Sequence, residues 1–95
     1  MNCRELTFTG HALVRMFQRE IGTSDVAEVV RAGEVIAEYP DDRPYPSSLM
    51  LGYVGGRPLH VVVAVDTASG RCHTITVYEP DPGLWNGDFR TRRTR

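Results

Sequence analysis

The stretch that decides the fold is Thr9–Ile21, TGHALVRMFQREI. Its polar and apolar residues alternate with the period of an α-helix. Thr9 is the predicted N-cap, because its hydroxyl can accept a hydrogen bond from a free backbone N–H of the first turn. One side of this helix is basic and carries His11, Arg15 and Arg19, with Gln18 beside them. The other side is apolar and carries Leu13, Val14, Phe17 and Ile21, flanked by Met16. We expect the apolar side to be buried.

Two interpretations of the basic side are open. Residues four apart are neighbours on a helix surface, so His11, Arg15 and Arg19 form a row of one titratable imidazole and two permanent cations. Histidine can exchange a proton near neutral pH, and arginine binds phosphate oxygens. The row therefore suits cleavage of a phosphodiester. The alternative is a solvated basic helix face whose cations pair with Glu5, Glu20 or Asp25.

Working outward from this helix, the chain gives one further helix and five strands. Arg4–Phe8 precedes it as a short strand. After it, Asp25–Ala32 is a second helix, and Gly33 is predicted to supply its left-handed C-terminal residue. The later strands are predicted at Glu34–Tyr39, Ser48–Val54, Leu59–Asp66 and Cys72–Glu79. They are separated by a loop with three prolines, a Gly55-Gly56 hairpin turn and a turn at Thr67–Gly70.

The order β-α-α-β-β-β-β predicts a single α+β domain over residues 1–80. Two N-terminal helices should pack on one face of an antiparallel sheet of four or five strands. Residues 81–95 are predicted to be an irregular, Arg-rich tail with a mobile end, pinned to the body by Leu84, Trp85 and Phe89. The predicted core consists of Leu13, Phe17, Val26, Val29, Val30, Ile36, Val61, Val63, Ile75 and Val77.

Composition sets the class of protein. The chain has 95 residues, of which 41% are hydrophobic and 24% charged, as in ordinary soluble domains. The N-terminus, MNCRELTF, has no apolar segment of signal-peptide length, so we expect a cytoplasmic protein without a membrane span. Cys3 and Cys72 are too few for a disulfide framework or a zinc site, and we expect them to be buried thiols. No metal-ligand spacing and no Gly-rich loop before a helix occurs, so no cofactor is predicted.

Charge is distributed unevenly along the chain. All eleven basic residues are arginines, and four of them lie in the last six residues. Residues 1–89 carry seven Arg against twelve Asp and Glu, a formal charge of −5. An acidic body with a basic tail differs from the net basic surface that is typical of nucleic-acid binders.

Further candidate residues lie on the strands. His60 stands in an apolar strand, where a hydrogen-bonded core histidine is more common than a catalyst. Thr76 and Tyr78 are two apart, so they share one face and could offer hydroxyls to a substrate. They could equally be ordinary strand residues, because Thr and Tyr have high strand propensity.

Several motifs in this order resemble those of one family. They are F-T-x-H-A-x-x-R-M-x-x-R from Phe8, D-V-x-x-V with G-E-V-I from Asp25, L-H-V-V-V from Leu59, and T-V-Y-E-P-D from Thr76 with a downstream Trp. Together they resemble the DUF4258 family of small bacterial proteins, over nearly the whole chain. That family is similar in layout to the RelE/ParE-like toxins. The resemblance implies a RelE-like fold and an endoribonuclease toxin held in check by an antitoxin protein, acting on RNA at the ribosome.

The motif positions of the family map onto His11, Arg15, Arg19, His60, Thr76 and Tyr78. We expect metal-independent RNA cleavage by attack of the 2′-hydroxyl on the adjacent phosphate. In this hypothesis His11 is the general base, and Arg15 and Arg19 stabilise the phosphoryl charge. His60 or Tyr78 protonates the leaving oxygen, and Thr76 binds substrate. These side chains should then line one concavity. The alternative is a non-enzymatic module that binds a protein partner through an exposed face, an edge strand or the Arg-rich tail.

Overall fold

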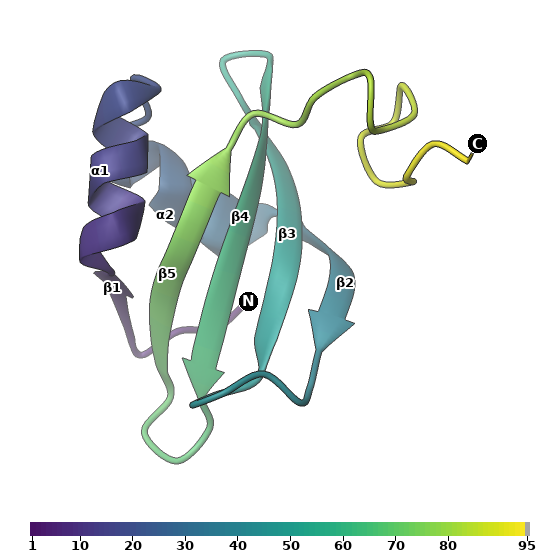
Figure 1. The fold of residues 1–95 in the computed structure, drawn as a ribbon. Coiled ribbons are helices and arrows are strands. Elements are labelled where there is room, and N and C mark those ends of the chain that lie inside the picture. The colour runs from purple at the N-terminus through teal and green to yellow at the C-terminus, as the bar shows by residue number, and fades with distance from the viewer. Residues whose placement is uncertain (95) are drawn as a thin grey trace.

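Two helices and one five-stranded sheet make up the computed structural model, which describes residues 1–94 (Figure 1). In chain order the elements are β1 (Glu5–Phe8), α1 (Gly10–Gln18), α2 (Thr23–Ala32), β2 (Glu34–Tyr39), β3 (Ser47–Val54), β4 (Arg57–Asp66) and β5 (Arg71–Tyr78). The predicted α+β class and element order are confirmed. Thr9 is the N-cap of α1, and its hydroxyl accepts from the Ala12 N–H at 3.1 Å.

The sheet is mixed, with strand order β1-β5-β4-β3-β2. The three pairs formed by β2 to β5 are antiparallel, whereas β1 pairs with β5 in parallel, with Leu6 opposite Cys72. The prediction of a purely antiparallel sheet is therefore wrong for this edge. Tight turns force neighbouring strands to be antiparallel. The whole remaining domain connects β1 to β5, so no hairpin constrains their direction.

Glycines have two distinct roles in these connections. Gly55 and Gly56 join β3 to β4 with φ angles of 59° and 77°, which a two-residue hairpin of this type requires. Gly33 has a φ of −75°, so the predicted left-handed conformation is wrong. A Cβ at Gly33 would lie 2.8 Å from the Leu51 carbonyl oxygen and closer still to that of Val29. Gly33 is needed because α2 and β3 approach too closely there for a side chain.

The hydrophobic core lies between the sheet and the two helices. Its buried members include Val26, Val29 and Val30 of α2, Val61 and Val63 of β4, and Val77 of β5, all of which were predicted. In Figure 1, α2 lies behind the sheet and α1 stands beside β5 at its edge. No helix of residues 1–94 lies on the opposite face of the sheet, which we call the open face. It carries His60, Val62 and Ala64 of β4, because alternate strand residues point to opposite sides.

The predicted buried side of α1 is wrong within the helix, although Ile21, which follows the helix, is buried as predicted. Leu13, Val14 and Phe17 are 45%, 56% and 86% exposed, whereas Ala12 and Met16 are buried. Because α1 stands at the edge of the sheet, only a narrow stripe meets the core, and two residues four apart fill it. Two other predicted core residues also lie outside it: Ile75 is exposed where β5 has an irregularity in register, and Ile36 is only half-buried.

A disulfide joins Cys3 to Cys72, with Cα atoms 5.6 Å apart. The prediction of two free thiols is therefore wrong. Their sequence separation of 69 hid this contact, because only the pairing of β1 with β5 brings the N-terminal segment to the start of β5. No helix among residues 1–94 is long and apolar enough to cross a membrane.

Candidate active site

The open face carries a histidine and a tyrosine from neighbouring strands. His60 of β4 and Tyr78 of β5 are cross-strand partners. His60 is fully buried, and its Nδ1 lies 3.3 Å from the Tyr78 hydroxyl. Its Nε2 lies 2.7 Å from the carbonyl oxygen of Phe89, in the C-terminal tail. The ring of Trp85 packs edge-on against the imidazole, with centroids 4.5 Å apart.

These contacts fix the protonation of His60. A carbonyl oxygen can only accept, so Nε2 carries a proton and donates it to Phe89, which leaves Nδ1 of the neutral ring to accept from the Tyr78 hydroxyl. Burial lowers the pKa of His60 below its usual 6.5, although the bond to Phe89 opposes the shift. Burial also raises the pKa of Tyr78 above its usual 10.0, as does the nearby Tyr39, whereas Arg92 lowers it. At pH 7 both groups are therefore neutral.

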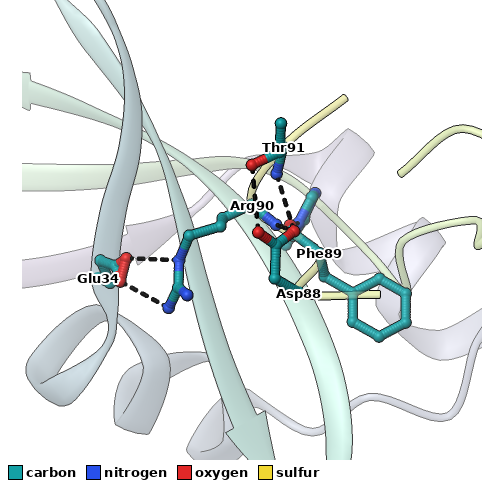
Figure 2. A network of polar contacts seen from close by, with 6 residues as sticks. Glu34, Asp88, Phe89, Arg90 and Thr91 are labelled. Atoms are coloured by element: carbon teal, nitrogen blue, oxygen red, sulfur yellow. Dashed lines mark hydrogen bonds and ion pairs between the residues drawn. The ribbon is translucent and has the colours of Figure 1, made fainter. Parts of the chain in front are cut away.

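A compact tail positions the Phe89 carbonyl (Figure 2). Arg90 donates to both carboxylate oxygens of Glu34, at 2.9 and 2.8 Å. The Asp88 carboxylate accepts from the backbone N–H groups of Arg90 and Thr91, at 3.0 and 3.1 Å. Phe89 itself has a φ of 55°, which turns the chain between these two anchors. The Arg90–Glu34 pair thus holds the tail against β2, and the Asp88 bonds fix the turn within the tail.

A hollow of about 410 Å³ opens beside Tyr78, and we call it the Tyr78 hollow. Its lining comprises Ile36, Ala37, Tyr39, Leu49, Tyr78, Trp85, Arg90 and Arg92. The Arg92 guanidinium lies over the Trp85 ring, 5.4 Å from its centroid. Among residues 1–94, no carboxylate forms an ion pair with Arg92. The hollow therefore combines a hydroxyl, aromatic surface and a cation available to an anionic ligand.

The structure separates the predicted site residues into two groups. Thr76, opposite Val62 on β5, lies on the same face of the sheet as Tyr78 and His60. His11 and Arg15 are exposed on α1, and Arg15 donates only to Gln18, at 3.4 Å. Arg19 donates to the Val77 carbonyl of β5 at 2.8 Å, so its guanidinium is bound to the sheet. Among residues 1–94, no hydrogen bond or ion pair joins these three helix residues to His60, Thr76 or Tyr78.

The pairing with carboxylates that was considered for the α1 arginines does not occur, because none of the ion pairs among the described residues contains Arg15 or Arg19. Sequence reasoning missed Tyr39, Phe89 and Arg92 as site residues. The only feature of the sequence that pointed to this region was Trp85 near an arginine cluster, and Trp85 was predicted to anchor the tail to the domain. Trp85 is indeed an anchor, only 7% exposed, whereas Leu84 is 44% exposed. Of the predicted tail, Arg95 lies outside the described residues.

The family described as "Domain of unknown function (DUF4258)" matches residues 8–79. The chain belongs to the DUF4258 family. The matched segment begins at the last residue of β1 and ends just after β5. It therefore includes His60 and Tyr78 but not the tail residues Trp85, Phe89 and Arg92. No curated protein and no solved structure matches the chain.

Proposed function

We propose that the protein is a RelE-like, metal-independent endoribonuclease that binds single-stranded RNA on the open face and cleaves it beside Tyr78. One observation carries this proposal: the Phe89 carbonyl, the His60 imidazole and the Tyr78 hydroxyl form a hydrogen-bonded chain, at 2.7 and 3.3 Å, beside a hollow that also contains Arg92. An acceptor that orients an imidazole, which in turn faces a hydroxyl, is the arrangement that prepares hydroxyl groups for proton transfer.

In the proposed reaction, the RNA 2′-hydroxyl attacks the adjacent phosphorus. Its proton passes to the Tyr78 oxygen while Tyr78 gives its own proton to Nδ1 of His60. The new O–P bond closes a 2′,3′-cyclic phosphate, and the 5′-oxygen leaves with a proton from water. The imidazolium then loses its proton to the remaining hydroxide. Arg92 stabilises the charge on the phosphoryl oxygens, and Tyr39, whose side chain is exposed, offers a surface on which a base can stack.

This proposal moves the general base from His11 to the Tyr78–His60 pair. The reason is contact: Tyr78 and His60 share a hydrogen bond, whereas His11 lies on α1 and makes none with them. Thr76 keeps its proposed role in binding substrate, because it lies on the same face. A toxin role, with an antitoxin that blocks the open face, belongs to the same proposal. Induced expression should then arrest growth, and the Tyr78→Phe variant should relieve the arrest.

Cleavage of RNA oligonucleotides by purified protein tests the mechanism. In the presence of EDTA, wild type should release fragments that end in a 2′,3′-cyclic phosphate. Tyr78→Phe keeps the ring and removes only the hydroxyl, so the rate should fall roughly 10²- to 10⁴-fold. Arg92→Gln should lower it by about 10²- to 10³-fold. Mass spectrometry identifies the ends, and gel electrophoresis gives the rates.

Matched controls are Tyr53→Phe, at an exposed tyrosine of β3, and Arg31→Gln, on α2. Both should cleave at the wild-type rate. The proposal is wrong if wild type cuts neither free RNA nor RNA on translating ribosomes. It is also wrong if His11→Ala and Arg15→Gln slow cleavage as much as Arg92→Gln does, since the site would then lie on α1.

A protein-binding module is the second candidate function, and the outer side of α1 favours it. Leu13, Val14 and Phe17 expose large apolar side chains on a helix without any acidic residue. Exposed apolar patches on soluble proteins commonly mark binding surfaces. The Arg15 guanidinium on the same helix would favour an acidic amphipathic segment of the partner.

Co-expression with the product of the adjacent open reading frame tests this second function. A complex that survives purification should be lost in Phe17→Asp and kept in a deletion of residues 87–95. Loss of the complex on that deletion instead would assign binding to the tail. If wild type alone is a dimer that Phe17→Asp converts to a monomer, the patch binds a second copy and the partner hypothesis is wrong.

A further inference from the structure

We propose that a second hollow on the open face binds a nucleobase, and that it prefers guanine. This inference extends the proposed function, because the base would belong to the RNA strand that is cut beside Tyr78. The hollow has a volume of about 270 Å³ and lies under the loop between β2 and β3. We call it the Tyr45 hollow. Val62, Ala64 and Ile75 supply its apolar surface, and Pro44, Tyr45 and His73 are also in its lining.

Two rings in this hollow are already held in place. Tyr45 and His73 stack with centroids 5.5 Å apart and planes inclined by 20°. Nδ1 of His73 is 2.6 Å from the Thr7 hydroxyl, which fixes the imidazole on β5. Aromatic side chains that are held in place lose little freedom when a base stacks against them, and such stacking is a main source of affinity for single-stranded nucleic acids.

Two neighbouring charged residues give the hollow its polar character. Asp42 and Arg43 both line it. The Asp42 carboxylate accepts from the Ser47 hydroxyl and retains capacity to accept further bonds. Among residues 1–94, Arg43 forms no ion pair. Guanine presents N–H donors that suit a carboxylate and the O6 and N7 acceptors that suit an arginine. An acceptor and a fork of donors side by side therefore fit guanine better than the other bases.

The two hollows lie along one path on the sheet. His73 lines the Tyr45 hollow, Tyr78 lines the other, and both belong to β5. Five steps along an extended strand lead from His73 to Tyr78, a distance of roughly 16 Å. Thr76 lies between the hollows, opposite Val62 at the border of the Tyr45 hollow, and both residues are partly exposed. A strand of a few nucleotides can therefore place a base in one hollow and a phosphate at the other.

Titration of the folded protein with mononucleotides tests the inference without any cleavage. The probes are GMP, AMP, CMP and UMP, with ribose 5-phosphate as the ligand that lacks a base, and NMR follows the Tyr45 and His73 ring signals. GMP should shift these signals at lower concentration than the other nucleotides. Tyr45→Ala should weaken GMP binding roughly tenfold, and Arg43→Gln should remove the preference for GMP.

Controls separate this inference from the proposed function. Tyr53→Ala and Arg4→Gln, both at exposed positions away from the hollow, should bind GMP as wild type does. The base site is wrong if no nucleotide shifts the ring signals or if ribose 5-phosphate shifts them equally. Equal binding of all four nucleotides overturns the preference for guanine. GMP binding without RNA cleavage supports the base site and contradicts only the ribonuclease proposal.

Discussion

His60 shows how one residue can tie stability to pH. Burial lowers its pKa below 6.5 in the folded protein. Below pH 6.5 the unfolded chain therefore binds a proton that the folded protein does not, so the free energy of unfolding falls as the pH falls. Well above pH 6.5 neither the folded nor the unfolded chain binds this proton, so the loss of stability is absent. Urea midpoints at pH 7.5 and 5.5 should differ less in His60→Gln than in wild type, because glutamine does not titrate.

The control for this prediction is His11→Gln, at an exposed histidine. It should keep the wild-type dependence on pH. An equal loss of stability on acidification in wild type and in His60→Gln would mean that His60 is not the group responsible.

Gly33 is a residue whose need for glycine comes from packing. Its Cβ would lie 2.8 Å from the Leu51 carbonyl oxygen and closer to that of Val29. Gly33→Ala should therefore destabilise the protein by about 1–3 kcal/mol, the usual cost of overpacking. Gly87→Ala is the matched control, because nothing lies within 4 Å of a Cβ there. Denaturant unfolding measures both, and equal stability of the two variants would contradict the close approach.

At the scale of the element, substitutions at two adjacent residues of α1 should change stability by very different amounts. Met16 is 2% exposed and Phe17 is 86% exposed. Met16→Ala should cost about 2–5 kcal/mol of unfolding free energy, because it leaves a cavity in the core. Phe17→Ala should change stability by less than about 0.5 kcal/mol, as surface substitutions usually do. The reverse result would show that α1 buries the side that its sequence pattern predicted.

At the scale of the whole molecule, the disulfide ties the N-terminal segment to β5 across 69 residues. Reduction should lower the free energy of unfolding by about 2–4 kcal/mol. Thermal unfolding with and without a phosphine reductant measures the effect, and a Cys3→Ser/Cys72→Ser double variant should not respond. Equal Tm values for oxidised and reduced wild type would contradict it. Structural disulfides are rare in the cytosol, so trapping the thiol state in cells also tests the predicted cytoplasmic location.

The sequence by itself determined the local features of this protein. Periodicity and turn residues predicted both helices, all five strands and the Gly55-Gly56 hairpin, because each depends on residues close together in the chain. The alternation along β4 and β5 placed Val61, Val63 and Val77 in the core and put Thr76 and Tyr78 on one face. It also named His60 and Tyr78 as candidates, although not their contact.

Only the tertiary structure decided what joins distant segments. Three features connect residues that are far apart in the sequence. They are the parallel β1–β5 pair, the disulfide, and the contacts of Trp85 and the Phe89 carbonyl with His60. The orientation of α1 belongs here too. Its sequence offers a wide apolar side of Leu13, Val14 and Phe17 and a narrow one of Ala12 and Met16, and the edge of the sheet has room for only the narrow one. Helix amphipathicity shows that a face can be buried, but the shape of the surface it meets decides which face is buried.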